Sequence, residues 1–340
     1  MTRCISLVAL MIAVLVAGCS AQSKSLRRVK VFTSAATFGK NDTVGLGSTC
    51  DSSGNIYVSI VDPATHEVRP PLMFDGEGQL RVKFVSPHLH YLTSILLPFG
   101  LAPRGGLAVA ERDSPNVRVV TFAADGEYES EVILSGPLFT PYQVAVFPSG
   151  TLLLSGSADG RKDRLFTAIY EKTGGFIKEL ILDGDAEIDR AVEIGDSRFA
   201  WSPGEGDRAI SSGKAHVGDD GNVYLLRSTS PANVYVISPS GVVVRRLTVE
   251  PVTVGDMPLD MQLSKGRLAI GFDGWLGTRS AGTPTLVVVD AVSGERLQVF
   301  DKGIGIFGLA RVSCYRADSG TFTYLGMTDS KQIETILASE

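Results

Sequence analysis

The chain has 340 residues, 44% of them hydrophobic, and its 37 acidic against 32 basic residues give a formal net charge of −5. This composition is typical of a globular protein and excludes a largely disordered chain. The mildly acidic balance and the aromatic content of 8% argue against a nucleic-acid partner, which would need a basic surface.

Residues 1–18 have the layout of a secretory signal, with Arg3 before a mainly apolar run from Ile5 to Ala17. This run is too short to span a bilayer, whose core needs about 20 residues, so we expect the segment to be removed. Its end reads Leu15-Val16-Ala17-Gly18-Cys19 and resembles a bacterial lipoprotein signal.

The lipoprotein resemblance implies that the Cys19 thiol is diacylated and that residues 19–26 form a lipidated tether. The body would then be held on a membrane outside the cytoplasm, firmly, because each buried methylene contributes about 0.8 kcal/mol. Ser20 after the cysteine favours the periplasmic or surface side of the outer membrane by the enterobacterial sorting rule. The alternative is an ordinary cleaved signal in which Cys19 is incidental.

Residues 27–340 are predicted to form one body of short strands. From Asp51 onward a turn glycine precedes a short apolar strand, and a second turn glycine follows 20 to 28 residues later. Apolar alternation bounded by Gly, Asp, Ser and Pro indicates strands and tight turns, and a repeat near fifty residues is typical of propeller blades. The first turns contain Gly54, Gly106, Gly150, Gly221, Gly266 and Gly320, and the second contain Gly78, Gly126, Gly175, Gly241 and Gly294.

Six such units predict an all-β fold, a six-bladed β-propeller. The sixth unit starts near Asp318 and is one strand short after Leu337. The segment Arg28–Phe32 alternates correctly for the missing strand, so we expect the N-terminal strand to close the last blade, which leaves short, protected edges.

The hairpins resemble NHL repeats, and the stretch Leu107–Val119 in blade two matches that pattern best, with Glu111 where the family usually has Asp. Blade four departs from it, with Arg227 at the acidic position and Tyr235 at the arginine position. The resemblance implies a propeller, and a propeller hosts many unrelated functions.

Two cysteines remain in the body, Cys50 and Cys314, near the ends of the predicted innermost strands of blades one and six. Those blades are neighbours where the ring closes, so a disulfide between them is possible in an oxidising compartment. The alternative is two separately buried thiols, because inner strands diverge and the Cα atoms could lie beyond about 7 Å.

The loops after each second strand and the connections between blades are expected to share one face, here called the loop side. An insertion at about 183–214, between blades three and four, belongs there, and such insertions commonly carry function. Both tryptophans lie in these loops, where aromatic side chains either anchor partners or fill the loop bases. The candidate ligand- or partner-binding residues are Arg112, Arg161, Trp201, Arg227, Asp273 and Trp275.

Catalytic signals are few. No Gly-rich phosphate loop, serine-nucleophile elbow or Cys-x-x-Cys motif occurs, so no catalytic residue is predicted. His88 and His90 form a His-x-His pair, a spacing that occurs in zinc sites. We favour the interpretation that both belong to a solvated loop between two blades. Some six-bladed propellers are metal-dependent lactonases or lyases, and the corresponding acidic ligands here would be Glu111, Asp113, Asp273 and Asp329. The alternative is that these carboxylates form surface salt bridges with basic residues such as Arg112, Arg227 and Lys331 around the channel mouth.

Two hypotheses follow from the sequence. The first is a binding or scaffold module without a cofactor, which presents its loop side to an envelope protein or a glycan. The second is a metal-dependent hydrolase or lyase that holds one divalent ion at the channel mouth. Bound metal would distinguish the two.

Overall fold

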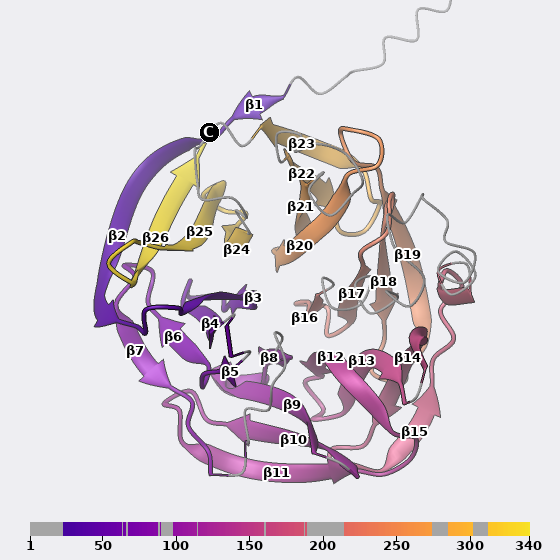
Figure 1. The fold of residues 1–340 in the computed structure, drawn as a ribbon. Coiled ribbons are helices and arrows are strands. Elements are labelled where there is room, and N and C mark those ends of the chain that lie inside the picture. The colour runs from indigo at the N-terminus through magenta and orange to yellow at the C-terminus, as the bar shows by residue number, and fades with distance from the viewer. Residues whose placement is uncertain are drawn as a thin grey trace, which may run out of the picture.

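The protein is described here from a computed structural model. The structure describes residues 23–340 except 63, 66, 88, 90–97, 114, 160, 187, 189–213, 274–284 and 302–311. The described residues form six small antiparallel sheets around a central axis, as Figure 1 shows in the view along that axis. The predicted six-bladed β-propeller is therefore confirmed.

Each blade starts with its innermost strand and runs outward. Blade one contains β3 (Thr43–Cys50), β4 (Ile56–Asp62), β6 (Leu72–Phe74) and β7 (Leu80–Lys83), with the short β5 (Glu67–Val68) beside β4. Blade two contains β8 (Phe99–Leu101), β9 (Leu107–Asp113), β10 (Asn116–Phe122) and β11 (Tyr128–Leu134), with the 3-10 turn η1 (Pro103–Gly105) between its first two strands. Blade three contains β12 (Phe139–Val146), β13 (Leu152–Ala158), β14 (Arg161–Tyr170) and β15 (Phe176–Glu179).

The second half repeats this plan. Blade four contains β16 (Ala215–Val217), β17 (Val223–Arg227), β18 (Ala232–Ile237) and β19 (Val243–Val249). Blade five contains β20 (Met257–Ser264), β21 (Arg267–Asp273), β22 (Thr285–Asp290) and β23 (Arg296–Asp301), and the short β1 (Lys24–Ser25) pairs with β23. Blade six contains β24 (Val312–Arg316), β25 (Thr321–Met327) and β26 (Gln332–Ser339), with β2 (Arg27–Thr37) outermost.

The core lies between the blades. Along β17 all five residues are buried, and they alternate between two clusters: Val223 and Leu225 pack with blade three, whereas Tyr224 and Leu226 pack with blade five. A middle strand is therefore apolar on both faces, which explains why it reads as a nearly continuous hydrophobic run. Each blade is stabilised mainly by its neighbours, so the ring must close to bury the last pair of faces.

The last blade is closed by the N-terminal strand, as the sequence predicts. β2 pairs antiparallel with β26 over a register that starts at Arg27 with Ser339 and ends at Thr37 with Gln332. A disulfide joins Cys50 to Cys314, with the two Cα atoms 5.2 Å apart. It links the innermost strands of blades one and six, so the ring is joined at its outer edge by hydrogen bonds and near its axis by a covalent bond.

The tether differs from the expectation. Lys24 and Ser25 pair in parallel with Phe300 and Asp301 of β23, and Leu26 is buried between blades five and six. The body thus begins at Lys24 rather than after residue 26, because the apolar Leu26 side chain has a place in the core. Figure 1 shows β1 beside the C-terminus at the outer edge of the ring.

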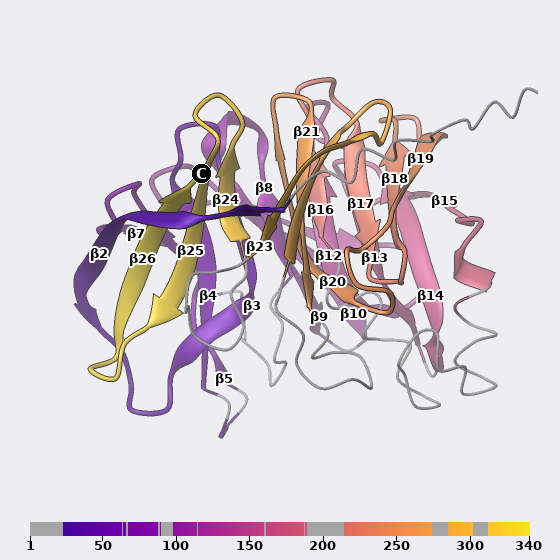
Figure 2. The ribbon, with the colours of Figure 1, turned by 90° about the horizontal axis from the view of Figure 1, so that it is seen from above.

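The two sides of the ring differ in their connections. Turns such as the one at Gly54, which join the first strand of a blade to the second, lie on one side, here called the turn side. The loop side is the lower side in the view of Figure 2, where β5 and the connection from β25 to β26 lie. Gly126, in the turn between β10 and β11, shows why a tight turn here needs glycine: its φ is +91°, and a Cβ there would approach Val82 Cγ1 to 2.5 Å.

Candidate binding site at the axial channel

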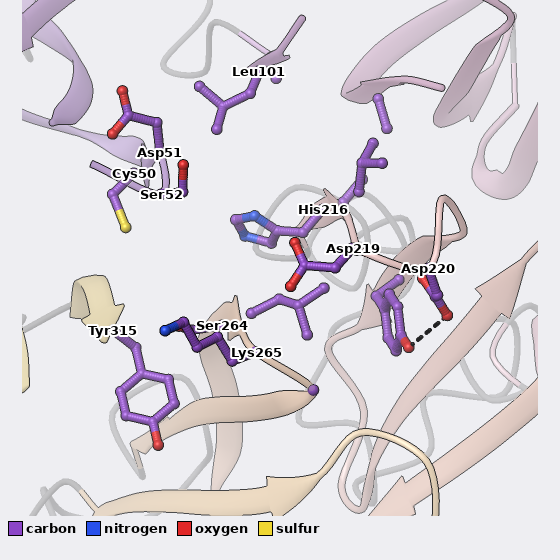
Figure 3. Close-up of a pocket in the computed structure, with 18 of the residues that line it drawn as sticks. Cys50, Asp51, Ser52, Leu101, His216, Asp219, Asp220, Ser264, Lys265 and Tyr315 are labelled. Atoms are coloured by element: carbon purple, nitrogen blue, oxygen red, sulfur yellow. Dashed lines mark hydrogen bonds between the residues drawn. The ribbon is translucent and has the colours of Figure 1, made fainter. Parts of the chain in front are cut away.

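A cavity of about 570 Å³ opens at the axis on the turn side. All six blades contribute to its wall at or next to the last residues of their innermost strands: Cys50, Leu101, Ala145, His216, Ser264 and Tyr315. Figure 3 shows several of these side chains around the opening. The site is therefore created by ring closure, because no single blade contributes more than a fraction of the wall.

His216 lies in the wall and is half-buried. Its Nε2 is 2.8 Å from the carbonyl oxygen of Met261, and its Nδ1 is 3.4 Å from Thr49 Oγ1. A carbonyl can only accept, so Nε2 carries the proton and Nδ1 accepts from the Thr49 hydroxyl. Burial, and then the charge of Lys214, lowers the pKa of His216 to about 4. The imidazole is neutral at pH 7, and it ties blade four to blades one and five.

A polar layer lies deeper in the channel, further from the turn side. Lys214 Nζ donates to the Ser48 carbonyl at 2.9 Å and is 3.8 Å from the buried carboxylate of Asp260. Gln262 Nε2 donates to the Val312 carbonyl at 2.9 Å. These contacts connect the innermost strands of blades one, four, five and six. Such a buried polar network favours one arrangement of the strands around the axis.

Two of the turns at the mouth are built on a tyrosine. In blade one, Asp51 accepts from the backbone N–H groups of Ser53 and Asn55, and the Tyr57 hydroxyl donates to it at 3.2 Å. In blade four, Asp220 and Tyr224 make the equivalent contact at 3.1 Å. Burial, and then the charge of Asp220, raises the pKa of Tyr224 to about 12, so the hydroxyl keeps the proton that it donates.

The remaining charges at the mouth are exposed. Lys265 Nζ is 3.4 Å from Asp318, and Arg316 Nε is 3.9 Å from the same carboxylate. Asp219 has no hydrogen bond or ion pair with any residue that the structure describes. The mouth therefore combines an ion cluster on the side of blades five and six with an available carboxylate on the side of blade four.

Two of the six predicted binding residues have described side chains, and both are used inside the protein. Arg112 Nη2 is 2.6 Å from Asp159 Oδ1, and its Nη1 donates to Thr140 Oγ1 at 3.2 Å, which connects blades two and three. It is half-buried, so part of its side chain still reaches the surface. The other is Arg227.

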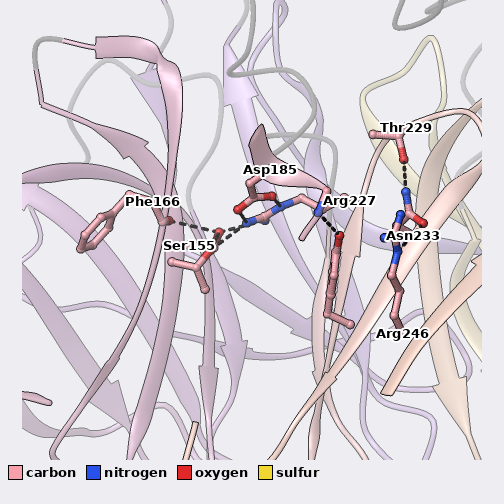
Figure 4. Close-up of polar contacts among 10 residues, drawn as sticks. Ser155, Phe166, Asp185, Arg227, Thr229, Asn233 and Arg246 are labelled. Atoms are coloured by element: carbon pink, nitrogen blue, oxygen red, sulfur yellow. Dashed lines mark hydrogen bonds and ion pairs between the residues drawn. The ribbon is translucent and has the colours of Figure 1, made fainter. Parts of the chain in front are cut away.

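For Arg227 the prediction of a surface role is wrong, because its side chain is 0% exposed. As Figure 4 shows, its guanidinium contacts Asp185 and Ser155, and it also donates to Thr167 Oγ1 at 2.7 Å. A buried arginine needs a carboxylate and further acceptors to offset desolvation, and Asp185 supplies the carboxylate. Arg227 thus fixes the start of the insertion to blades three and four.

The other predicted residues cannot be placed with side chains. Arg161 lies in β14 and Asp273 ends β21, but only their backbone is described. Cys19, Trp201, Trp275, His88 and His90 lie outside the described residues. Their proposed roles stay predictions.

The hydrolase hypothesis requires four acidic residues to meet at the axis, and the described members of this set do not meet there. Glu111 is buried on β9, its carboxylate is 3.4 Å from Arg118 Nε, and Asp113 contacts the same guanidinium. Asp329 lies in the turn from β25 to β26 in blade six. Within the described part of the chain no group of three or more His, Cys, Asp or Glu residues could hold a metal ion.

Sequence reasoning missed the pocket. Residues that form its wall, such as His216 and Asp219, are not among the candidate binding residues named from the sequence. A signal was present: the spacing Gly54-Asn55-x-Tyr57 recurs as Gly221-Asn222-x-Tyr224. It marks turns that place a carboxylate at the channel mouth.

No family model matches this chain, and no curated protein matches its sequence. A member of the DUF4221 family from Bacteroides vulgatus has a similar structure, with 9% identity, a TM-score of 0.57, and 93% of this chain and 98% of that chain covered. A candidate exported protein from Bacteroides fragilis is similar at 9% identity and a TM-score of 0.54, with 95% and 97% covered. At this identity the likeness supports the propeller fold alone.

Among the residues that the structure describes, no helix has the length and apolar character needed to cross a bilayer. The resemblances to NHL repeats and to a lipoprotein signal stay predictions.

Proposed function

We propose that this protein is a lipid-anchored binding module of the bacterial cell envelope, which takes an envelope protein or a glycan at the axial pocket on its turn side. The observation that carries the proposal is the pocket itself, a cavity of about 570 Å³ lined by all six blades. Pockets of about 300–1,000 Å³ with a few converging polar groups are the usual form of a small-molecule binding site.

The chemistry of the pocket favours binding over turnover. Both nitrogens of His216 are engaged by backbone or hydroxyl groups, and Asp51 and Asp220 are held by their turns. The exposed groups at the mouth include the Asp219 carboxylate and the ion cluster at Asp318. These groups suit recognition of a ligand that carries hydrogen-bond donors, such as a sugar or a polar loop of a protein.

The location follows from the lipoprotein resemblance of the segment ending at Cys19. An acylated Cys19 would hold the propeller on a membrane outside the cytoplasm, and the disulfide between Cys50 and Cys314 suits an oxidising compartment. A candidate exported protein of Bacteroides fragilis with the same fold agrees with this location.

The proposal is tested by isolating the acylated full-length protein from its own membranes after crosslinking, followed by mass spectrometry and elemental analysis. Asp219→Arg reverses the charge of an exposed side chain at the pocket, and Glu129→Arg makes the same change on the exposed outer strand β11, where Glu129 lies far from the pocket. We expect one partner at stoichiometric yield with the wild type and with Glu129→Arg, and at least a tenfold lower yield with Asp219→Arg.

A second set of variants separates the two sides of the ring. Replacement of Arg161, Trp201 and Trp275 by Ala changes loop-side residues named from the sequence. Loss of the partner with this triple variant but not with Asp219→Arg would refute the pocket as the binding site. A retained divalent ion without a partner would refute the binding module altogether.

A further inference from the structure

The N-terminal edge of blade six has an unusual distribution of charge. Between Cys19 and Asp42 the chain has five basic residues and no acidic residue. Four of the five lie within seven positions, at Lys24, Arg27, Arg28 and Lys30. The protein as a whole is acidic, so this segment differs in sign from the net charge of the chain.

The structure places this segment on an open edge. β2 is the outermost strand of blade six, and among the described strands it pairs only with β26. Arg27, Arg28 and Lys30 are exposed, and the apolar Val29 and Val31 between them are 59% and 42% exposed. Segments that bind at a membrane surface combine basic side chains with apolar ones, and β2 exposes both kinds.

The register of β2 adds to this exposure. The pairing with β26 shifts between Arg28 and Lys30, so Val29 lies at an irregularity and has no partner residue in the ladder. Lys30 Nζ lies 4.3 Å from the centre of the Phe32 ring, which holds its ammonium group at the edge of the blade.

Three outer strands carry basic residues without an acidic one, and β2 carries the most. A charged side chain on an outer strand discourages pairing with another molecule, and β7 and β19 each carry two basic residues and no acidic one. In those two strands Arg81 pairs with Asp75 and Arg246 pairs with Asp183. In β15 Lys178 is next to Glu179, and β11 contains Glu129 and Glu131. β2 has three cations and no acid over its full length.

The position relative to the lipid anchor decides the partner. Cys19 is five residues before Lys24, which is already paired with β23 and bonded to Glu340 at 2.8 Å. Five residue steps span at most about 18 Å. An acylated Cys19 therefore keeps the rim at blades five and six close to the bilayer, and Figure 1 shows that β1 and the start of β2 lie together at that rim.

We propose that the exposed edge strand β2, through Arg27, Arg28, Val29, Lys30 and Val31, docks on the surface of an anionic phospholipid bilayer. The inference rests on the proposed lipid anchor at Cys19. Each basic residue near an anionic surface strengthens binding by about fivefold, so three act together with the acyl chains. The propeller then stands on its rim with its axis along the membrane plane, which leaves the pocket mouth open to the side.

The test uses the acylated full-length protein in vesicles of phosphatidylcholine with about 30% phosphatidylglycerol, an anionic lipid. A tryptophan is introduced at the rim by Val31→Trp, and a matched control is made by Ile133→Trp on β11, whose side chain is 58% exposed. Figure 1 shows β11 at the lower edge of the ring, separated from β2 by blade one. A headgroup spin label then quenches whichever tryptophan lies near the bilayer, after the signal of the wild type is subtracted.

We expect at least twofold quenching at position 31 and none at position 133. Quenching at position 31 should be lost in the triple variant Arg27→Glu, Arg28→Glu, Lys30→Glu, and also near 1 M salt, where the screening length falls to about 3 Å. The variant should still float with the vesicles, because the acyl chains remain.

Three results would overturn the inference. Equal quenching at both positions would mean that the propeller has no fixed orientation. Flotation without quenching at position 31 would refute the docking edge and leave the lipid anchor intact. Failure of the wild type to float would refute the anchor itself, and with it the reason for the rim to face the membrane.

Discussion

Removal of the disulfide between Cys50 and Cys314 is expected to destabilise the folded ring. The two residues are 264 positions apart, so the bond closes nearly the whole body into one loop. In the chain-entropy model a loop of this length lowers the entropy of the unfolded chain by about 19 cal/mol/K, or about 5–6 kcal/mol at 25 °C. The strand pairing of β2 with β26 keeps the ring closed without the bond, so the variant should fold.

The assay compares the wild type with Cys50→Ala/Cys314→Ala by urea unfolding and by heating. With an unfolding entropy of about 2.1 cal/mol/K per residue, a body of this size has about 0.7 kcal/mol/K, so the midpoint should fall by about 8 °C. Strong reductant in the denaturant should shift the wild type toward the variant and leave the variant unchanged. A loss under about 1 kcal/mol, or an equal effect of reductant on both proteins, would refute the reasoning.

Three further outcomes are expected from the described contacts. Arg227→Met leaves the buried carboxylate of Asp185 without this arginine and should lower the free energy of unfolding, measured in urea, by about 3–5 kcal/mol. Arg164→Met breaks an exposed ion pair and should lower it by under about 1 kcal/mol. Similar losses for the two variants would contradict the buried ion pair between Arg227 and Asp185. His216 has a pKa of about 4 in the folded protein against about 6.5 when unfolded, so the unfolded chain binds the extra proton between these values. Stability should therefore fall by about 3 kcal/mol from pH 7 to pH 4. His216→Asn should remove that part of the pH dependence, and unchanged curves would show that the imidazole is protonated in the fold. Gly126→Ala should lower the free energy of unfolding by about 3 kcal/mol, because a Cβ there meets Val82 and φ is positive. Gly266→Ala, whose Cβ would meet no atom within 4 Å, should lower it by about 1 kcal/mol for its positive φ alone. Equal losses in urea unfolding would mean that the structure relieves the crowding at position 126.

The propeller could be predicted because its information is local and repeated. Turn glycines such as Gly54 and Gly221, with the apolar strands that follow them, are read from one short stretch at a time. The missing strand of blade six was also predictable, since an N-terminal segment with the right alternation remained unassigned. The structure extended that strand from Arg28–Phe32 to Arg27–Thr37 and moved the start of the body to Lys24.

The functional prediction was less complete because it depends on contacts between distant segments. Arg227 is charged and follows an apolar strand, so from the sequence it is expected at the surface. Its partners Asp185, Ser155 and Thr167 are 42 to 72 residues away, and burial becomes favourable only when all three converge. Nothing in the local pattern gives that convergence.

By itself the sequence determined the architecture of this protein, the number of blades, the way the ring closes and the expectation of a lipid anchor at Cys19, because periodicity, turn chemistry and signal layout are properties of neighbouring residues. The tertiary structure decided which charges are available. It buried Arg227, joined Cys50 to Cys314 and brought residues from all six blades to the axis around His216. A wall assembled from segments about fifty residues apart exists only after the ring has closed, so the local turn signal at Gly54 and Gly221 does not by itself show that these segments meet.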